Sequence, residues 1–252
     1  MSKDFDAAKV QEALVAWIRE YFEKNTWEGA NAVLGISGGK DSTVAAALCT
    51  LALGKERVVG VMMPDGVQPD IEDSRKVIAA LGIRSVEVNI GKATSALAAA
   101  VEEGMEGGMS RDAKINMPPR LRMATLYGVA QTVPHGGLVI NTCNLSEDYV
   151  GYSTKYGDSA GDITPLSDLT ATEVMALGKQ LETIFPMDGL THKTPSDGLC
   201  GLTDEDRFGF TYAVLDRYIR EGVCEDEAIR RKIDEMHRKN LHKLQLMPKF
   251  TM

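Results

Sequence analysis

The chain has 252 residues, with 28 Lys and Arg against 36 Asp and Glu and a formal net charge of -8. This length can bury a sizeable core, and a chain that is 44% hydrophobic and 25% charged is ordinary for a globular protein. The acidic balance argues against nucleic-acid binding, which depends on Lys and Arg. The apolar run 44–53 is shorter than the ~20 residues that a membrane-spanning helix needs, and the first residues lack a secretory signal pattern. We therefore expect a cytoplasmic protein without a membrane or nucleic-acid partner.

The predicted elements alternate between strand and helix over the first two thirds of the chain. Buried apolar runs predict strands, and amphipathic periodicity predicts helices. In chain order we expect a helix at 7–24, a strand at 32–36, a helix at 41–53, a strand at 58–63, a helix at 70–81, a strand at 85–88, helices at 92–103 and 119–132, a strand at 137–142, and helices at 171–183, 204–220 and 225–240. Such alternation is typical of an α/β fold with a doubly wound, mostly parallel sheet flanked by helices. We predict a single domain over residues 1–252 with a helical C-terminal subregion.

A glycine-rich turn links the first strand to the second helix, and reads Gly35-Ile36-Ser37-Gly38-Gly39-Lys40-Asp41-Ser42. A strand, a glycine turn and a helix N-terminus bring backbone N–H groups and the positive end of the helix dipole to one point, which suits phosphate. The turn is neither a Walker A loop, because Asp41 follows Lys40, nor a Rossmann fingerprint, because its glycines are adjacent. The alternative is a capped glycine turn that holds no ligand.

A second polar span follows the fourth predicted strand. It comprises Asn141–Glu147, Gly151–Asp158 and Asp162–Leu166. A span of this length without regular structure usually builds a functional site. The alternative is a solvated surface loop.

Together these motifs resemble a known family. Ser-Gly-Gly-x-Asp-Ser resembles the pyrophosphate-binding loop of the N-type ATP pyrophosphatases, and with the second span it resembles NAD synthetase. The resemblance continues through Asn116–Met123, which contains Arg120 and Arg122, through Lys193–Ser196 and through His242-Lys243. It extends over about residues 10–243. It implies an adenine nucleotide alpha hydrolase-like fold. It also implies a ligase that adenylates the carboxylate of deamido-NAD with ATP, releases pyrophosphate, and lets ammonia displace AMP to give NAD.

The resemblance assigns roles to individual residues. Asp41 and Glu147 are expected to hold Mg²⁺, because each follows a parallel strand whose carboxyl end faces one crevice, and Mg²⁺ takes one or two carboxylates besides phosphate. These two acids and Asp162 are the expected catalytic residues. The expected ATP contacts are Gly35, Ile36, Ser37, Gly38, Gly39, Lys40, Asp41, Ser42, Thr142 and Ser196. The expected deamido-NAD contacts are Arg120, Lys155, Asp162, His242 and Lys243. Asp162 and Asp197 both remain open as the acceptor of a proton from ammonium.

Two further expectations come from the family comparison. Glutamine-dependent members carry an amidohydrolase domain ahead of the phosphate loop, which here begins at residue 35, so free ammonia is the expected nitrogen donor. The family is typically a homodimer, and we expect the same here. The chain departs from the family at Ala171, where a phosphate-contacting lysine is usual, and Lys40 is the expected substitute, ahead of Lys179 and Lys193.

Three other functions compete with this interpretation. A tRNA-thiolating or lysidine-forming enzyme of the same superfamily needs a basic face or cysteine motifs, and the four cysteines here are scattered at 49, 143, 200 and 224. A sensor that holds ATP without turnover and a purely structural protein are the remaining alternatives.

Overall fold

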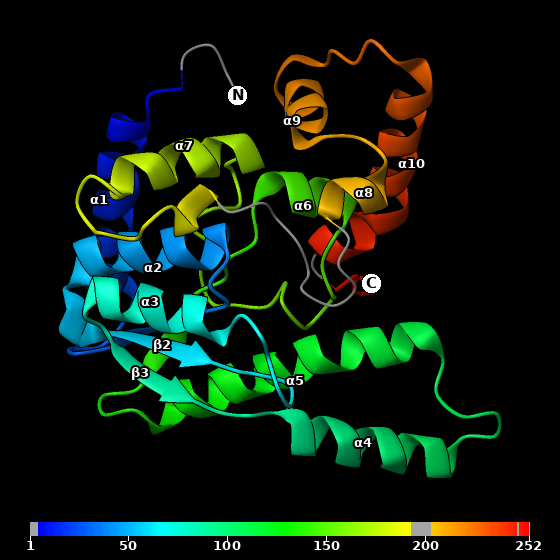
Figure 1. Cartoon of the computed structure of the whole chain (residues 1–252), viewed down its shortest axis with the longest axis horizontal. Coiled ribbons are helices and arrows are strands. Elements are labelled where there is room, and N and C mark those ends of the chain that lie inside the picture. Colours follow the sequence, from blue (N-terminus) through cyan, green and yellow to red (C-terminus); the bar gives the residue numbers. More distant parts are fainter. Residues whose placement is uncertain (1–4, 193–202, 246, 252) are drawn as a thin grey trace.

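A four-stranded parallel sheet forms the centre of the computed structural model, which describes residues 5–192, 203–245 and 247–251 (Figure 1). The strands are β1 (Asn31–Gly35), β2 (Val58–Met62), β3 (Arg84–Glu87) and β4 (Gly137–Val139), in the order β3-β2-β1-β4. A parallel bridge between Ile140 and Ile163 continues the sheet beyond β4. The expected α/β class and parallel sheet are confirmed.

Helices cover both faces of this sheet. They are α1 (Ala7–Asn25), α2 (Lys40–Leu53), α3 (Ile71–Leu81), α4 (Gly91–Gly104), α5 (Arg111–Thr132), α6 (Leu145–Val150), α7 (Ala171–Leu181), α8 (Asp204–Phe208), α9 (Tyr212–Glu221) and α10 (Glu227–Leu244). The short 3-10 turns η1 (Lys55–Arg57) and η2 (Leu190–His192) complete the set. In Figure 1, α1, α2, α3 and α7 lie above the sheet, and α4 and α5 lie below it.

Alternation along β1 explains the two layers. Leu34 points to the core shared with Leu48 of α2 and Leu177 of α7, whereas its neighbour Val33 points to the opposite core beside Ala130 of α5. Successive side chains of a strand face opposite sides. A strand that is apolar on both faces is therefore buried between two helical layers.

The order of the strands fixes the place of the site. The chain moves outward from β1 through β2 to β3 and then returns to pair β4 with the other edge of β1. Ligands of such sheets bind outside the carboxyl ends of the strands at this reversal. Residues 36–42 and 140–147 follow β1 and β4 at that point.

Three predicted boundaries were wrong. The helix expected at 119–132 begins at Arg111 and contains Pro118 and Pro119, although proline usually starts or ends a helix. The Ser110 hydroxyl accepts the N–H of Ala113 and caps this earlier start. The helix expected at 204–220 is two helices, α8 and α9, because Gly209 adopts a left-handed φ of 72° and ends the first. The strand expected at 137–142 ends at Val139.

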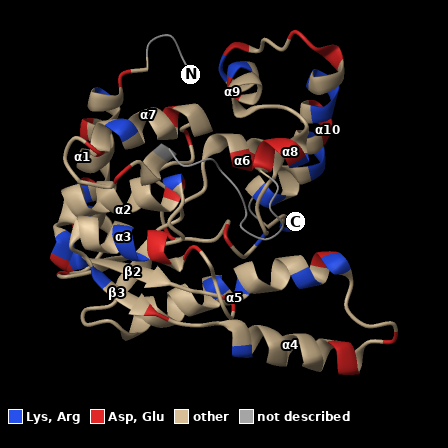
Figure 2. Cartoon of the chain, in the orientation of Figure 1, with Lys and Arg blue, Asp and Glu red and all other residues tan. Residues whose placement is uncertain are grey.

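A third apolar cluster, separate from the two cores on the sheet, holds the C-terminal helices together. Phe208 of α8 stacks on Phe210 with ring centroids 5.5 Å apart, and the cluster includes Tyr212, Leu215 of α9 and Ile233 of α10. Acidic and basic residues both occur along α9 and α10 (Figure 2). These helices form the C-terminal subregion that the sequence predicts.

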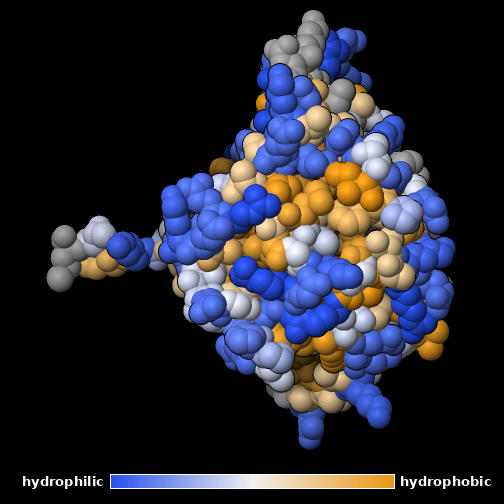
Figure 3. Space-filling view, turned by 90° about the vertical axis from the view of Figure 1, so that its left-hand side faces the viewer, coloured by the Kyte–Doolittle hydropathy of each residue, from blue (hydrophilic) through white to orange (hydrophobic). Residues whose placement is uncertain are grey.

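One face of the molecule carries a group of apolar side chains. Figure 3 shows them gathered at the centre of the face over α1 and α2, with polar side chains around them. Within the described ranges, the helices are too short or too polar to span a membrane.

Gly151 joins the short helix α6 to α10 and gives a test of this packing. It adopts φ 68° as the C-cap of α6, and a Cβ there would lie 2.1 Å from Asn240 Cβ. Gly222 caps α9 with a similar φ of 71°, but a Cβ there would meet nothing within 4 Å. We expect Gly222→Ala to lower the free energy of unfolding by about 1–2 kcal/mol through the left-handed backbone alone. Gly151→Ala adds the clash, worth a further ~1–3 kcal/mol.

Urea titration of both variants measures the difference. Equal losses in Gly151→Ala and Gly222→Ala would contradict the tight contact between α6 and α10.

Candidate active site

The phosphate loop is shaped by hydrogen bonds among its own residues. The Ser37 and Ser42 hydroxyls are 3.0 Å apart, Gly39 N donates to Ser37 Oγ, and Ser42 Oγ donates to Gly39 O. Thr43 N is the first in this stretch to bond back into the helix, at Gly39 O. The N–H groups of the first turn of an α-helix lack intrahelical partners. The loop therefore presents backbone donors and the positive dipole end of the 14-residue helix α2.

Gly38 is required by space as well as by backbone conformation. Its φ is 80°, and a Cβ there would lie 2.8 Å from Asp73 Cβ and 2.9 Å from Ser74 N in α3. The close approach of α3 thus fixes the loop from behind.

Asn144 joins this loop to the second polar span. Its side-chain oxygen accepts the N–H of Glu147 and caps α6, while its Nδ2 donates to Asp41 Oδ1 at 3.0 Å. One fully buried amide therefore ties the N-terminus of α6 to that of α2. The tie brings Asp41 and Glu147, 106 positions apart in sequence, to one place.

The Lys40 ammonium lies between these two carboxylates. Nζ is 2.6 Å from Asp41 Oδ2 and 3.5 Å from Glu147 Oε1, and it lies over the Tyr212 ring, 5.6 Å from the ring centroid. Burial by itself would lower the pKa of Lys40, but the carboxylates of Asp41 and Glu147 outweigh burial and raise it. Burial raises the pKa of Glu147, Asp41 raises it further, and Lys40 opposes the rise.

Tyr212 and Asp204 surround Glu147 from the C-terminal subregion. The Tyr212 hydroxyl lies 3.1 Å from Asp204 Oδ2 and 3.5 Å from Glu147 Oε1. Burial and the nearby carboxylates raise the pKa of Tyr212 strongly, so its hydroxyl keeps its proton. The hydroxyl can therefore donate a hydrogen bond to a carboxylate. Neither residue belongs to the motifs, and sequence reasoning missed both.

The helix that carries Glu147 is also held from the side. Asp216 of α9 is fully buried and accepts Ser146 Oγ at 2.5 Å and Thr172 N at 2.8 Å. Ser146 Oγ in turn accepts the N–H of Ala171. Because α6 has six residues, such outside contacts determine its position.

The two carboxylates fit a magnesium ion in their chemistry. Asp41 and Glu147 line one pocket together with oxygen-bearing Ser37, Ser42 and Thr142. Among the described residues, three or more His, Cys, Asp or Glu side chains do not converge as a metal site. Mg²⁺ usually takes one or two protein carboxylates and completes its shell with water and phosphate. The pair is therefore suited to an ion that arrives with phosphate.

The basic residues expected to contact deamido-NAD form a second group, around the loop that follows α6. Arg120 Nε donates to Lys155 O at 3.4 Å, Lys155 Nζ donates to His242 O at 2.6 Å, and Lys243 Nζ donates to the carbonyls of Gly151 and Ser153. These bonds hold the loop that follows α6 between α5 and α10. Side chains from three distant segments are thus brought together.

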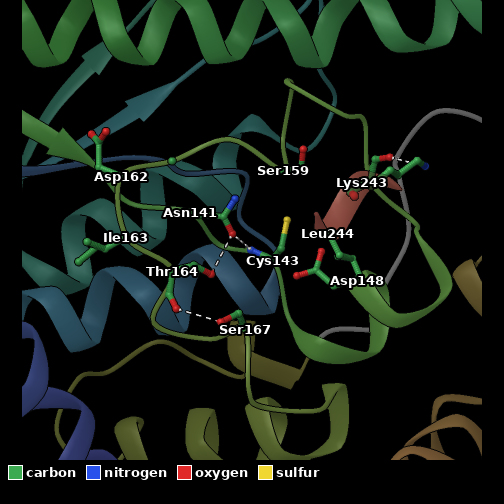
Figure 4. A pocket seen from close by; sticks show the side chains of 12 residues that line it. Asn141, Cys143, Asp148, Ser159, Asp162, Ile163, Thr164, Ser167, Lys243 and Leu244 are labelled. Atoms are coloured by element: carbon green, nitrogen blue, oxygen red, sulfur yellow. Dashed lines mark hydrogen bonds between the residues drawn. The ribbon is translucent and has the colours of Figure 1, made fainter. Parts of the chain in front are cut away.

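Asp162 lies at the far side of a second, polar pocket (Figure 4). Its Oδ2 accepts the N–H of Val139 at 2.7 Å, and its Oδ1 lies 3.3 Å from the Tyr127 hydroxyl. Lys243 and Asp148 lie on the other side of the pocket. The cavity volume is about 210 Å³, and its wall is formed by Asn141, Cys143, Asp148, Ser153, Ser159, Gly161, Asp162, Ile163, Thr164, Ser167, Lys243 and Leu244.

Four further residues singled out from the sequence are Ala171, Ser196, Lys193 and Asp197. Ala171 is fully buried in the C-terminal cluster that also contains Tyr212, the ring beneath Lys40. Ala171 thus belongs to the same apolar cluster as the ring over which Lys40 lies. The expected contact Ser196 and the candidates Lys193 and Asp197 lie outside the described residues.

Comparison with known proteins agrees with this geometry. The family model described as NAD synthase matches residues 10–249. The NH(3)-dependent NAD(+) synthetase of Finegoldia magna is 42% identical over 84% of this chain and 84% of its own length. A solved NMN synthetase from Francisella tularensis has a TM-score of 0.88 and 32% identity, and the match covers 99% of this chain and 100% of that chain.

A glutamine-dependent relative is much longer. The glutamine-dependent NAD⁺ synthetase of Acinetobacter baumannii matches with a TM-score of 0.69 and 26% identity over 97% of this chain, but over 47% of its own. The family model covers most of this chain, and a curated relative is more than 40% identical to it. This chain therefore belongs to the NAD synthase family of ligases.

Proposed function

We propose that the protein amidates deamido-NAD to NAD with ATP, Mg²⁺ and ammonia. One observation carries the proposal: the carboxylates of Asp41 and Glu147 meet on one ammonium at the phosphate loop. Arg120, Lys155 and Lys243 form a basic group around the loop that follows the Glu147 helix. A carboxylate is a poor electrophile until it is adenylated. The enzyme must therefore hold two anions together and stabilise the pyrophosphate that leaves.

The chain supplies this stabilisation at two neighbouring places. The loop from Ser37 to Ser42 offers backbone and hydroxyl donors to the ATP phosphates, and the carboxylate pair would hold Mg²⁺ against them. The ion, when bound, neutralises charge that develops on the leaving phosphates. Arg120, Lys155 and Lys243 face the anionic substrate, and their positive side chains match its phosphates and carboxylate.

The acceptor of the ammonium proton is assigned to Asp162. It is exposed, its carboxylate is oriented by Val139 N and Tyr127, and it borders the polar pocket. Asp162 thus combines a fixed position with access to solvent, as proton transfer requires. Asp197 keeps its place as the alternative.

Subunit state and compartment are also proposed. The helix α4 has no buried residue, and its Leu97 is 43% exposed. Ile115 of the neighbouring helix α5 is 44% exposed. We propose a homodimer that covers these apolar side chains. Cys49, Cys143 and Cys224 are free thiols, which fits the proposed cytoplasmic compartment.

A mononucleotide substrate is the second candidate. The structure with a TM-score of 0.88 is that of an NMN synthetase, and the match covers that chain in full. Amidation of nicotinic acid mononucleotide uses the same carboxylate chemistry, without the adenylate half of the substrate.

Competition between deamido-NAD and nicotinic acid mononucleotide decides which of them is the substrate. With both present at equal concentration, we expect NAD to form faster than NMN, since a dinucleotide offers additional phosphate to Arg120, Lys155 and Lys243. Liquid chromatography measures both products. Faster formation of NMN would transfer the assignment to the mononucleotide.

The nitrogen donor is tested with labelled substrates. We expect nitrogen from labelled ammonium to enter the amide with one AMP released per amide, and glutamine to support no product. Mass spectrometry of the amide and of AMP measures both. Equal rates with glutamine, in a preparation free of glutaminase, would contradict ammonia dependence.

The metal assignment is tested by removing one charge at a time. Asp41→Asn and Glu147→Gln should each lower kcat by about 10² or more, because each removes charge that holds the ion against the transferring group. The exposed Glu56, before β2, offers Glu56→Gln as a control that keeps wild-type activity. Circular dichroism shows whether the folds match. Near-normal turnover of Glu147→Gln would mean that another residue is the second ligand.

A further inference from the structure

The Lys40 ammonium is buried at a position that disfavours a cation. Lys40 is 2% exposed and is the first residue of α2, where the helix dipole is positive. A buried ammonium needs opposite charge close by. Asp41 at 2.6 Å and Glu147 at 3.5 Å supply it.

The carboxylates need Lys40 as much as Lys40 needs them. Two carboxylates held side by side repel each other, and this repulsion raises the pKa of Glu147 in addition to burial. The ammonium between them opposes this repulsion. The two carboxylates that pair with Lys40 are also those assigned to Mg²⁺, so both cations require the same two groups.

A divalent ion and the ammonium cannot share this position at low energy. Both cations would lie within a few ångströms of each other in a partly buried place, where like charges repel strongly. The phosphates of ATP change this balance. They bring several negative charges to the loop, and the flexible four-carbon stem of lysine can turn its ammonium toward them.

We propose that Lys40 is an internal counter-cation that occupies the Asp41–Glu147 pair in the nucleotide-free protein, so that a divalent ion enters only together with the nucleotide. The identity of that nucleotide rests on the proposed function. The exclusion of metal from the free protein rests on the positions of three side chains. The device keeps a cation on the carboxylate pair between turnovers.

Mn²⁺ binding to the nucleotide-free protein tests the proposal. Electron paramagnetic resonance of free Mn²⁺, at constant pH, measures uptake by wild type and by Lys40→Met, which keeps a long unbranched apolar side chain at this position. We expect Lys40→Met to bind one Mn²⁺ at least about tenfold more tightly than wild type, because the competing cation is gone. Adding Glu147→Gln to Lys40→Met should return the affinity to the wild-type level.

The matched control is a lysine paired with a carboxylate on the surface. Lys24 contacts Glu20 in α1, and its side chain is 69% exposed. Lys24→Met should bind Mn²⁺ as wild type does.

Two results would overturn the proposal. One is tight binding of Mn²⁺ by the wild-type protein in the absence of nucleotide. The other is unchanged affinity in a Lys40→Met protein whose circular dichroism is native. If Lys40→Met does not fold, Lys40→Gln, which keeps a hydrogen-bond donor, replaces it.

Failure of the proposed function gives a different pattern. If the protein makes no amide but Lys40→Met gains Mn²⁺ affinity, the counter-cation proposal stands and the proposed function fails. If the protein makes amide but the wild type binds Mn²⁺ tightly without nucleotide, the proposed function stands and only the counter-cation proposal fails.

Discussion

The hydrogen bond from Asn144 to Asp41 is the contact on which the site depends. It joins the N-terminus of α6 to that of α2 across the carboxyl ends of β4 and β1. A buried amide that has both of its ends paired is costly to displace. It links the six-residue helix that carries Glu147 directly to the phosphate loop. The sheet reversal places the two segments near each other, and this bond aligns them.

The remaining contacts of α6 support the same arrangement from other directions. Asp216 holds Ser146 from α9, and Gly151 meets Asn240 of α10 at the other end of the helix. The C-terminal helices thus act on the chemistry through α6, and Tyr212 reaches Glu147 directly. This explains why a subregion outside the sheet belongs to the catalytic unit.

Local patterns were enough to predict the sheet and the loop, because they involve neighbours in sequence. The strand ending at Gly35 and the turn Ser37–Gly39 carry their own signals, namely apolar runs and adjacent glycines. Contacts between distant residues carry no such signal. Asn144 caps α6, a helix that the sequence analysis did not predict. Its bond to Asp41 and the approach of Tyr212 arise from tertiary packing.

The errors have the same origin. The start of α5 at Arg111 overrides the local preference of Pro118 and Pro119, since packing on the sheet and on α4 rewards a longer helix. The break at Gly209 separates α8 from α9 and lets Asp204 and Tyr212 face each other. A continuous helix over 204–220 would place these two residues eight positions apart on one rod and prevent their hydrogen bond.

The central claim is that Asp41 and Glu147 form one cation site shared in turn by Lys40 and Mg²⁺. A crystal structure of the protein with Mg²⁺ and an ATP analogue that cannot be cleaved between the α and β phosphates tests it most directly. The expected result is a metal ion bound by both carboxylates and by phosphate, with the Lys40 ammonium moved from the pair to a phosphate oxygen. A metal ion that contacts neither carboxylate, or a Lys40 that stays between them beside the bound ion, would contradict the account.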